Sequence, residues 1–288
     1  MRWTLKTTPN ITSVQQLSKD LSIDNTLSKL LVQRGISTFE EAKKFFRPSL
    51  EELHDPFLLK DMNLAVSRIE KAIANNENIL IYGDYDVDGT TSVSLVASYL
   101  KTITTSISTY IPDRYDEGYG ISYQGIDFAA DNNFSLIIAL DCGIKAIDKV
   151  AYATKKKVDF IICDHHKPGP KIPDAVAVLN PKRVDCSYPY DELCGCGVGF
   201  KLVQALASKR GQTIEDLTQY LDLVAIAIAA DIVPITGENR VLTYFGLQVI
   251  NSNPRNGIKA IIQEVHKKVL TITDVVFIIA PRINAAGR

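Results

Sequence analysis

Short apolar runs that alternate with helical stretches constrain the fold of this chain more than any other feature. The runs are ILIYGD (79–84), SISTYIP (106–112), SLIIALDCG (135–143), VDFIICDHH (158–166) and AVAVLN (175–180). Continuous β-branched runs of this length, separated by helices, are typical of parallel strands that helices cover on both faces. The sequence therefore predicts an α/β protein with a doubly wound, mostly parallel sheet.

Helical sequence on either side of these runs suggests three parts. Residues 1–75 are polar with helical spacing, and Ser37 and Glu40 have the spacing of a capping box, so we expect a helical N-terminal lead-in. The α/β catalytic domain is expected at residues 76–235. Residues 236–288 are expected to form a connecting helical region and the beginning of a second domain, which makes the chain read as a truncated part of a longer protein.

Composition restricts the class of protein without identifying it. The net charge is −1, so the sequence lacks the basic excess that is usual in proteins that bind nucleic acid. Divalent cations held by a carboxylate cluster would make the working charge of a site more positive than this count. No segment approaches the ~20 apolar residues of a membrane span, so we expect that the protein is neither secreted nor inserted into a membrane. The odd set of five cysteines fits a reduced, cytoplasmic protein.

Three of the apolar runs end in acidic residues or histidines. The first run is followed by three aspartates, the third by one, and the fourth by an aspartate and two histidines: Asp84, Asp86, Asp88, Asp141, Asp164, His165 and His166. The carboxyl ends of parallel strands meet at one edge of a sheet, where ligands bind. A helix N-cap or a turn would explain any one of these residues alone. The whole set predicts a functional site.

Electrostatic repulsion indicates what that site holds. Several carboxylates in a partly buried cleft raise one another's pKa unless cations lie between them. Oxygen ligands with one or two imidazoles suit Mn²⁺ or Mg²⁺, and histidine ligation favours Mn²⁺. Two such ions about 3.5–4 Å apart can activate a water and stabilise the leaving oxygen in phosphoryl transfer. We therefore expect two divalent metal ions and hydrolysis of phosphoester bonds.

Six motifs, taken in order, resemble those of the DHH phosphoesterase superfamily, and within it the RecJ family of single-strand exonucleases. They are GDYDVDGTTS (83–92), IPDRYDEGYGIS (111–122), ALDCG (139–143), CDHH (163–166), ADIVPITGENR (230–240) and PRINAAGR (281–288). The resemblance implies a hydrolase acting on ester bonds: a metal-dependent 5′-to-3′ exonuclease that degrades single-stranded DNA to mononucleotides in DNA repair and recombination. It also implies that the C-terminal residues lead into a second, DHHA1-like domain.

The resemblance assigns roles to individual residues. It implies five metal ligands, namely Asp86, Asp88, Asp141, His165 and Asp231. Asp141 is the candidate for the bridging carboxylate, and Asp84 fits a further ligand or a supporting acid. Asp164 is expected to orient His165, and His166 to face the scissile phosphate. Asp231 ends the apolar stretch LDLVAIAIAA, so it could also simply terminate a buried helix.

Other positions bear on the substrate. Arg114, Arg282 and Arg288 are implied to bind the 5′ phosphate or the backbone, for which a planar guanidinium is suited. Tyr82 stands where many members of the superfamily have a histidine. RecJ-type members share this departure, which argues against the pyrophosphatase-type and cyclic-dinucleotide-type relatives.

The segment CGCGVGFK is open to two interpretations. Gly195, Gly197 and Gly199 could expose backbone N–H groups to a phosphate, but we favour a tight turn. For Cys194 and Cys196 we favour small buried side chains over a zinc site, because no second pair has ligand spacing. His54 also reads as structural.

Two alternatives remain beside the exonuclease. The first is a phosphodiesterase of the same superfamily that acts on oligonucleotides or cyclic dinucleotides. The second is a non-catalytic scaffold in a replication or repair complex, against which the full set of acids and both histidines argues. The expected partners are single-stranded DNA and repair proteins such as a helicase or a single-strand-binding protein.

Overall fold

The computed structural model describes residues 4, 6, 7, 9–265 and 267–286, and it divides into two compact units, Met1–Glu52 and Leu53–Arg288. The first unit holds α1 (Ile11–Leu21), α2 (Asn25–Val32), α3 (Phe39–Phe46) and the 3₁₀ helix η1 (Leu50–Glu52). These helices enclose a small core of Leu17, Leu31, Ile36 and Ala42.

The capping box of α3 lies one residue later than predicted. Thr38, not Ser37, accepts a hydrogen bond from the N–H of Glu41, and the Glu41 carboxylate accepts from the N–H of Thr38. Both pairs have the required spacing, so the sequence alone did not choose between them. The helix that begins at Phe39 places Ala42 in the core, which favours the later pair.

The second unit contains the sheet and most of the helices. In chain order its elements are η2 (Pro56–Leu58), α4 (Met62–Ala74), β1 (Asn78–Gly83), α5 (Val87–Leu100), β2 (Ile107–Tyr110), α6 (Tyr123–Asp131), β3 (Phe134–Leu140), α7 (Ile147–Lys155), β4 (Asp159–Cys163), β5 (Ala177–Leu179), α8 (Gly195–Lys209), η3 (Glu215–Tyr220), α9 (Leu221–Asp231), α10 (Gly237–Ser252), α11 (Asn256–Gln263), α12 (Ile272–Asp274), the π-helix η4 (Val275–Ile279) and α13 (Ala280–Ala286). The division at residues 52 and 53 falls earlier than the expected boundary at 75, because α4 packs on α8 and β5.

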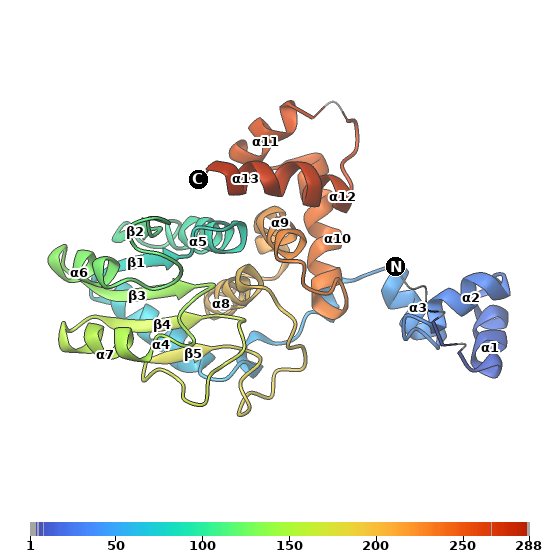
Figure 1. Cartoon of the computed structure of the whole chain (residues 1–288), viewed down its shortest axis with the longest axis horizontal. Helices are drawn as coiled ribbons and strands as arrows, with labels where there is room; N and C mark the ends of the chain where they lie inside the picture. Colours follow the sequence, from blue (N-terminus) through green and yellow to red (C-terminus); the bar gives the residue numbers. More distant parts are fainter. Residues whose placement is uncertain (1–3, 5, 8, 266, 287–288) are drawn as a thin grey trace. The chain divides into compact units, whose positions relative to one another are not determined.

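The five strands form one parallel sheet in the order β2-β1-β3-β4-β5 (Figure 1). This confirms the predicted α/β fold. In a sheet of this order, β2 is added on one side of β1 and the later strands on the other side, so the strand order reverses between β1 and β3. Ligands bind outside the carboxyl ends of the strands at that point. The register pairs Gly83 with Leu140 and Leu140 with Cys163. The next residue of each strand, Asp84, Asp141 or Asp164, therefore lies at the same edge.

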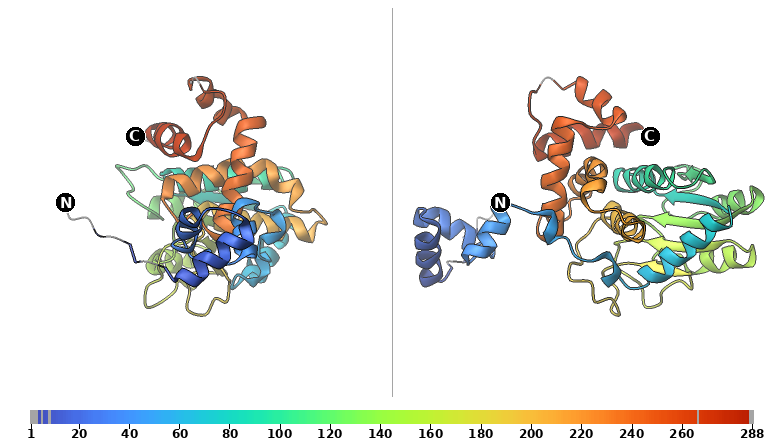
Figure 2. Two further views of the ribbon diagram at one scale, coloured as in Figure 1. Left: turned by 90° about the vertical axis from the view of Figure 1, so that its right-hand side faces the viewer. Right: turned by 180° about the vertical axis from the view of Figure 1, so that it is seen from behind.

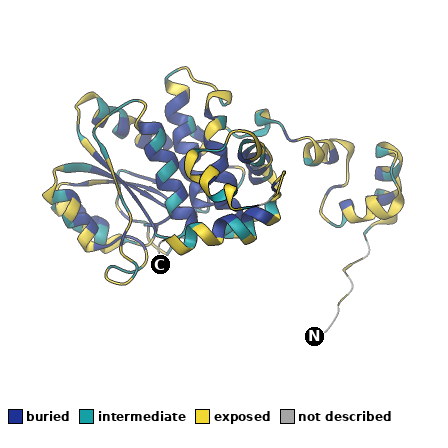
Figure 3. Cartoon of the chain, turned by 90° about the horizontal axis from the view of Figure 1, so that it is seen from above, coloured by how far each residue is buried: buried dark blue, intermediate teal, exposed yellow. Residues whose placement is uncertain are grey.

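Helices cover both faces of the sheet, and the strands at its centre are accordingly apolar and buried over most of their length. Helices α6 and α7 pack on β3 and β4 over one face, and α5, α8 and α4 cover the other. Alternate side chains such as Ile81 and Tyr82 are fully buried on opposite faces. Figure 3 shows the strands largely in the colour of buried residues.

Helix α9 connects the helices that cover the sheet to the C-terminal helices. It is apolar on all sides, and it contacts α5, α8 and α10. A Cβ at Gly246 of α10 would lie 2.2 Å from the carbonyl oxygen of Leu221, so the close approach of α9 and α10 requires glycine. The C-terminal helices pack back onto α9 around Val275 and Ile279 (Figure 2). Among the described residues, no helix is long and apolar enough to span a membrane.

Candidate metal centre

The turn from β1 into α5 gathers three aspartates. A Cβ at Gly89 would lie 2.4 Å from the backbone carbonyl oxygen of Asp84, so only glycine lets the helix begin this close to the strand. Asp86 caps α5 by accepting a hydrogen bond from the N–H of Gly89 at 2.9 Å. Asp88 follows in the first turn of the helix and is buried. The turn thus fixes all three acids at the strand end.

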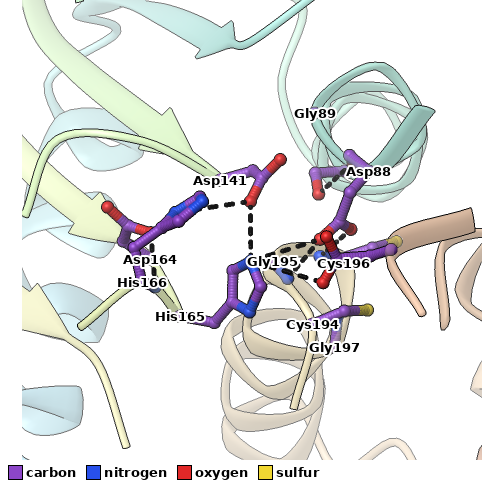
Figure 4. Close-up of polar contacts among 12 residues, drawn as sticks. Asp88, Gly89, Asp141, Asp164, His165, His166, Cys194, Gly195, Cys196 and Gly197 are labelled. Atoms are coloured by element: carbon purple, nitrogen blue, oxygen red, sulfur yellow. Dashed lines mark hydrogen bonds and ion pairs between the residues drawn. The ribbon is translucent and has the colours of Figure 1, made fainter. Parts of the chain in front are cut away.

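Asp88 is held by the amino end of α8 (Figure 4). Its two oxygens accept hydrogen bonds from the N–H groups of Gly195, at 2.6 Å, and Cys196, at 2.7 Å. These amides and the positive end of the helix dipole favour the carboxylate. Burial works in the opposite direction and, with the charge of Asp231, raises the pKa of Asp88 to about 7. The glycine-rich segment therefore offers its N–H groups to an aspartate of the site, which neither interpretation of its sequence anticipated.

His165 lies among three carboxylates that come from separate elements. Its Nε2 atom is 3.2 Å from Asp141 Oδ1 and 3.8 Å from Asp88 Oδ2 (Figure 4), and it is 3.6 Å from Asp231 Oδ2. Burial lowers the pKa of His165 to about 4, so the imidazole is neutral at neutral pH. A neutral imidazole does not compensate the carboxylates around it.

Burial and mutual repulsion outweigh the compensation that the protein gives the acids of this cluster. Burial, and then the charge of Asp88, raises the pKa of Asp141 well above its usual value. Burial, and then the charge of Asp86, raises the pKa of Asp231 to about 6. Asp141 also has a φ of +58°, a left-handed conformation that costs energy for a residue other than glycine. The fold holds these side chains together at the expense of stability.

Two overlapping groups of side chains in this cluster fit divalent cations. The ligand atoms of Asp88, His165 and Asp231 lie within 4.8 Å of one another, and so do those of Asp141, His165 and His166. Asp141 Oδ1 and His165 Nε2 are buried and make no hydrogen bond. An unsatisfied buried acceptor costs ~1–3 kcal/mol, so a ligand that bound both atoms would remove a substantial penalty. Carboxylate and imidazole donors suit Mn²⁺ or Mg²⁺.

Asp84 lies beside these groups rather than within them. Its Oδ1 accepts a hydrogen bond from the N–H of Gly120 at 3.2 Å, while its buried Oδ2 has no hydrogen-bond partner. Burial raises its pKa to about 6. The bonded Oδ1 fits a supporting acid and the unpartnered Oδ2 fits a further ligand, so both predicted roles of Asp84 stay open.

Asp164 orients a histidine, as predicted, but the histidine is His166 and not His165. Its carboxylate bonds His166, through the ring Nδ1 at 2.7 Å and the backbone N–H at 3.0 Å, and it also accepts from the N–H of Ile144. The chain turns after β4 so that the residue two positions on folds back over Asp164, whereas His165 points toward Asp88 and Asp231. Although burial opposes it, the hydrogen bond from His166 lowers the pKa of Asp164. Asp164 therefore orients His166.

The three arginines predicted to bind phosphate differ in where the structure places them. Arg114 places its guanidinium carbon 4.2 Å from the centre of the Tyr85 ring, and its Nε is buried without a hydrogen-bond partner. Arg282 is exposed and donates to the carbonyl oxygen of Ile278 in its own helical turn, so the structure does not bring it to the cluster. Arg288 lies outside the described residues.

Asn284 reaches the site, although the sequence analysis overlooked it. It belongs to α13, and it lines a cavity of about 160 Å³ together with Asp86, Asp88 and Asp231. Its Oδ1 atom is buried without a hydrogen-bond partner. Its position within the motif PRINAAGR, between Arg282 and Arg288, is the sequence signal for this role.

Comparisons with known proteins agree with this geometry. Residues 78–228 match the DHH family, N-terminal domain. Among curated relatives, the single-stranded-DNA-specific exonuclease RecJ of Bacillus subtilis (strain 168) is 40% identical, and the match covers 100% of this chain and 36% of that protein. The RecJ of Escherichia coli (strain K12) is 33% identical, over 91% of this chain and 47% of that protein. The chain thus spans between about a third and a half of the length of these relatives.

Solved structures give the same result. A crystal structure of exonuclease RecJ bound to manganese matches with a TM-score of 0.74 and 30% identity, over 83% of this chain and 59% of that one. RecJ from Thermus thermophilus in complex with Mn²⁺ matches with a TM-score of 0.83 and 26% identity, over 99% of this chain and 40% of that one. These matches confirm the resemblance to RecJ. The match to the DHH family extends over residues 78–228, which is just over half of the 288 residues. The chain therefore belongs to the DHH family.

Proposed function

We propose that this chain is the catalytic part of a metal-dependent 5′-to-3′ exonuclease that hydrolyses single-stranded DNA to mononucleotides in DNA repair and recombination. The observation that carries the proposal is the pair of buried, unpartnered atoms Asp141 Oδ1 and His165 Nε2, 3.2 Å apart, with Asp88 and Asp231 beside them. The relatives that match nearly the whole chain are single-stranded-DNA-specific exonucleases, which supports the substrate.

The proposed cofactors are two divalent ions, Mn²⁺ or Mg²⁺, as in the manganese and magnesium complexes of the similar RecJ structures. The side chains that would hold them are Asp86, Asp88, Asp141, His165 and Asp231. When bound, such ions activate water and stabilise charge on phosphoryl oxygens.

The chain's own residues would then bind and orient the substrate. Asp164 holds Nδ1 of His166, and this hydrogen bond raises the pKa of His166 and favours its protonated form. The His166 side chain is 42% exposed, so its Nε2 can donate a hydrogen bond to a phosphate oxygen. We assign His166 to the scissile phosphate and Arg114 to the 5′ phosphate.

The proposed setting follows from the same relatives. Single-stranded DNA is the proposed substrate, and a helicase or single-strand-binding protein the proposed partner in repair. The proposed compartment is the cytoplasm, where the cysteines of the chain, which are free in the structure, would stay reduced.

One assay separates the candidate functions. The chain is incubated with Mn²⁺ and 5′-labelled single strands, duplexes, dinucleotides, cyclic dinucleotides or pyrophosphate. Mononucleotides released from the 5′ end of long single strands are the expected result. Hydrolysis of only the small substrates would support the alternative phosphodiesterase, and Mn²⁺ binding without any hydrolysis would support the scaffold. Asp141→Ala should abolish metal-dependent cleavage, and cleavage that survived it would contradict the assignment of Asp141.

A further inference from the structure

The loop between β2 and α6 is fastened beside the metal centre by bonds that the proposed hydrolysis does not use. The buried hydroxyl of Tyr82 donates to the carbonyl oxygen of Gly120, at 2.9 Å, and accepts from the N–H of Ser122, at 3.1 Å. The Glu117 carboxylate accepts hydrogen bonds from the hydroxyl of Tyr110, at 2.9 Å, and from the start of the loop at the N–H of Asp113, at 2.8 Å. These contacts fix the loop along most of its length.

At the tip of this loop, Tyr119 stays half exposed. It stands between Gly118 and Gly120, both with a φ of +80°, and its side chain is not drawn into the core: the residue is 52% exposed. Its hydroxyl lies 3.4 Å from Nε2 of His166, the atom assigned to the scissile phosphate. A loop fixed by hydrogen bonds thus holds a half-exposed aromatic ring directly beside the reacting centre.

Tyr119 is part of a row of flat groups. Its ring meets the ring of Tyr85 edge to face, with centroids 5.9 Å apart, and the ring of His166 in the same way at 6.3 Å. Tyr85 in turn contacts the guanidinium of Arg114, whose carbon lies 4.2 Å from the ring centre. The row runs from the residue proposed for the 5′ phosphate to the residue proposed for the scissile phosphate.

Nucleobases are the ligands that such a row suits. Bases of single strands stack on tyrosine rings and on arginine planes, and every base offers a π-face, so this contact tolerates any sequence. A ring beside the scissile phosphate is well placed to meet the base that this phosphate carries. Simple phosphate esters would gain nothing from it.

We propose that Tyr119, supported by Tyr85, forms a seat for the nucleobase of the nucleotide whose phosphate occupies the metal centre. The site thereby selects nucleotides over other phosphate esters. This proposal rests on the proposed function, because it takes a nucleotide as the substrate. Tyr82 acts through Tyr119: by bonding Gly120 and Ser122 it holds the ring in place.

The test compares two ligands that differ only in the base. Thymidine 5′-monophosphate and 2-deoxyribose 5-phosphate are titrated calorimetrically into the full chain with Mn²⁺. The wild-type chain should prefer the nucleotide at least ~5-fold, the low end of the range for one base stacked on an aromatic side chain. Tyr119→Ala should bring this ratio close to one, and Tyr119→Phe should keep it, since the ring remains. Tyr115→Ala is the matched control: Tyr115 lies on the same loop and is 81% exposed.

Each other outcome counts against the proposal. A wild-type ratio near one, or an unchanged ratio in Tyr119→Ala, would overturn the base seat while Mn²⁺-dependent binding of the sugar phosphate still supported the metal centre. If Tyr119→Phe behaved like Tyr119→Ala, the hydroxyl next to His166 would be the cause and stacking would be refuted. If neither ligand bound and no strand were hydrolysed, the proposed function would fail, and the base seat with it.

Discussion

Gly195 stands where α8 comes closest to the carboxylate at the end of β3. A Cβ at this position would lie 2.5 Å from Oδ1 and 2.6 Å from Cβ of Asp141. Either α8 would have to move away, which would lengthen the 2.6 Å hydrogen bond from the N–H of Gly195 to Asp88, or Asp141 would have to move away from His165. We predict that Gly195→Ala both destabilises the chain and weakens its binding of metal ions.

The size of this effect can be judged against a second glycine of the same helix. Overpacking a tight site costs typically ~1–3 kcal/mol, whereas Gly→Ala at a helix position with space gains up to ~1 kcal/mol. Gly199 has that space, since its Cβ would meet Val96 at 3.4 Å and Leu140 at 3.5 Å, which are ordinary contacts. The free energies of unfolding of Gly195→Ala and Gly199→Ala should therefore differ by ~1–4 kcal/mol, with Gly195→Ala the less stable.

Two measurements check this prediction. Urea unfolding followed by circular dichroism gives the free energies, and calorimetric titration of the folded proteins gives the affinity for Mn²⁺. Loss of a residue that positions metal ligands typically costs about 10–100-fold in affinity, and we expect a loss of this order for Gly195→Ala and none for Gly199→Ala. If Gly195→Ala matched Gly199→Ala in both stability and Mn²⁺ affinity, the claim that α8 positions these ligands would be refuted.

Three further predictions concern charge. Asp88, with a pKa raised from 3.8 to about 7, and His166, with a raised pKa, bind protons more tightly in the folded chain. The contribution of Asp88 to stability is lost as pH rises from about 4 to about 7, and that of His166 as pH rises above 6.5, so the metal-free chain should lose thermal stability over this range, and saturating Mn²⁺ should reverse this loss. Asp141→Asn removes a charge at a left-handed position that asparagine tolerates, so it should raise the Tm of the metal-free chain and abolish Mn²⁺-dependent hydrolysis; an unchanged Tm would contradict the repulsion argument. Lys201→Met should cost ~3–5 kcal/mol in urea unfolding, because it leaves the fully buried Glu238 carboxylate without its cation, and Glu238→Gln in the same chain should recover part of this loss.

The strand-end part of the site was predictable because it follows from parallel-sheet geometry. An apolar run buried on both faces ends where the sheet ends, so the first polar residue after it marks the edge. The register of Gly83, Leu140 and Cys163 then places the acids that follow them in one row. Knowledge of side-chain packing was not needed for that step.

The other residues of the site reach it through the way the helices and side chains pack, and the local sequence does not encode this packing. Asp231 ends a helix that is apolar on all sides, so no amphipathic pattern indicates which way it faces. Asn284 reaches the cavity through the packing of α13 on α9 and α5. The pairing of Asp164 with His166 rather than His165 depends on how three consecutive side chains turn. For Asp231 the family resemblance supplied what the local pattern lacked.

The energetics of the centre connect these two sets of residues. Asp141 at the end of β3 and Ile232, directly after Asp231, both have left-handed backbones, with φ of +58° and +60°. The carboxylates of Asp88, Asp141 and Asp231 also repel one another. A fold that only had to be stable would lose such features, since substitution at either position would relieve strain or charge. Cations that bind the folded cluster but not the unfolded chain reverse this balance, because their binding free energy adds to that of folding. The strained, like-charged arrangement is therefore the one expected of a cation-binding site, and the stability that we predict Mn²⁺ to restore would measure how strongly the folded cluster binds it.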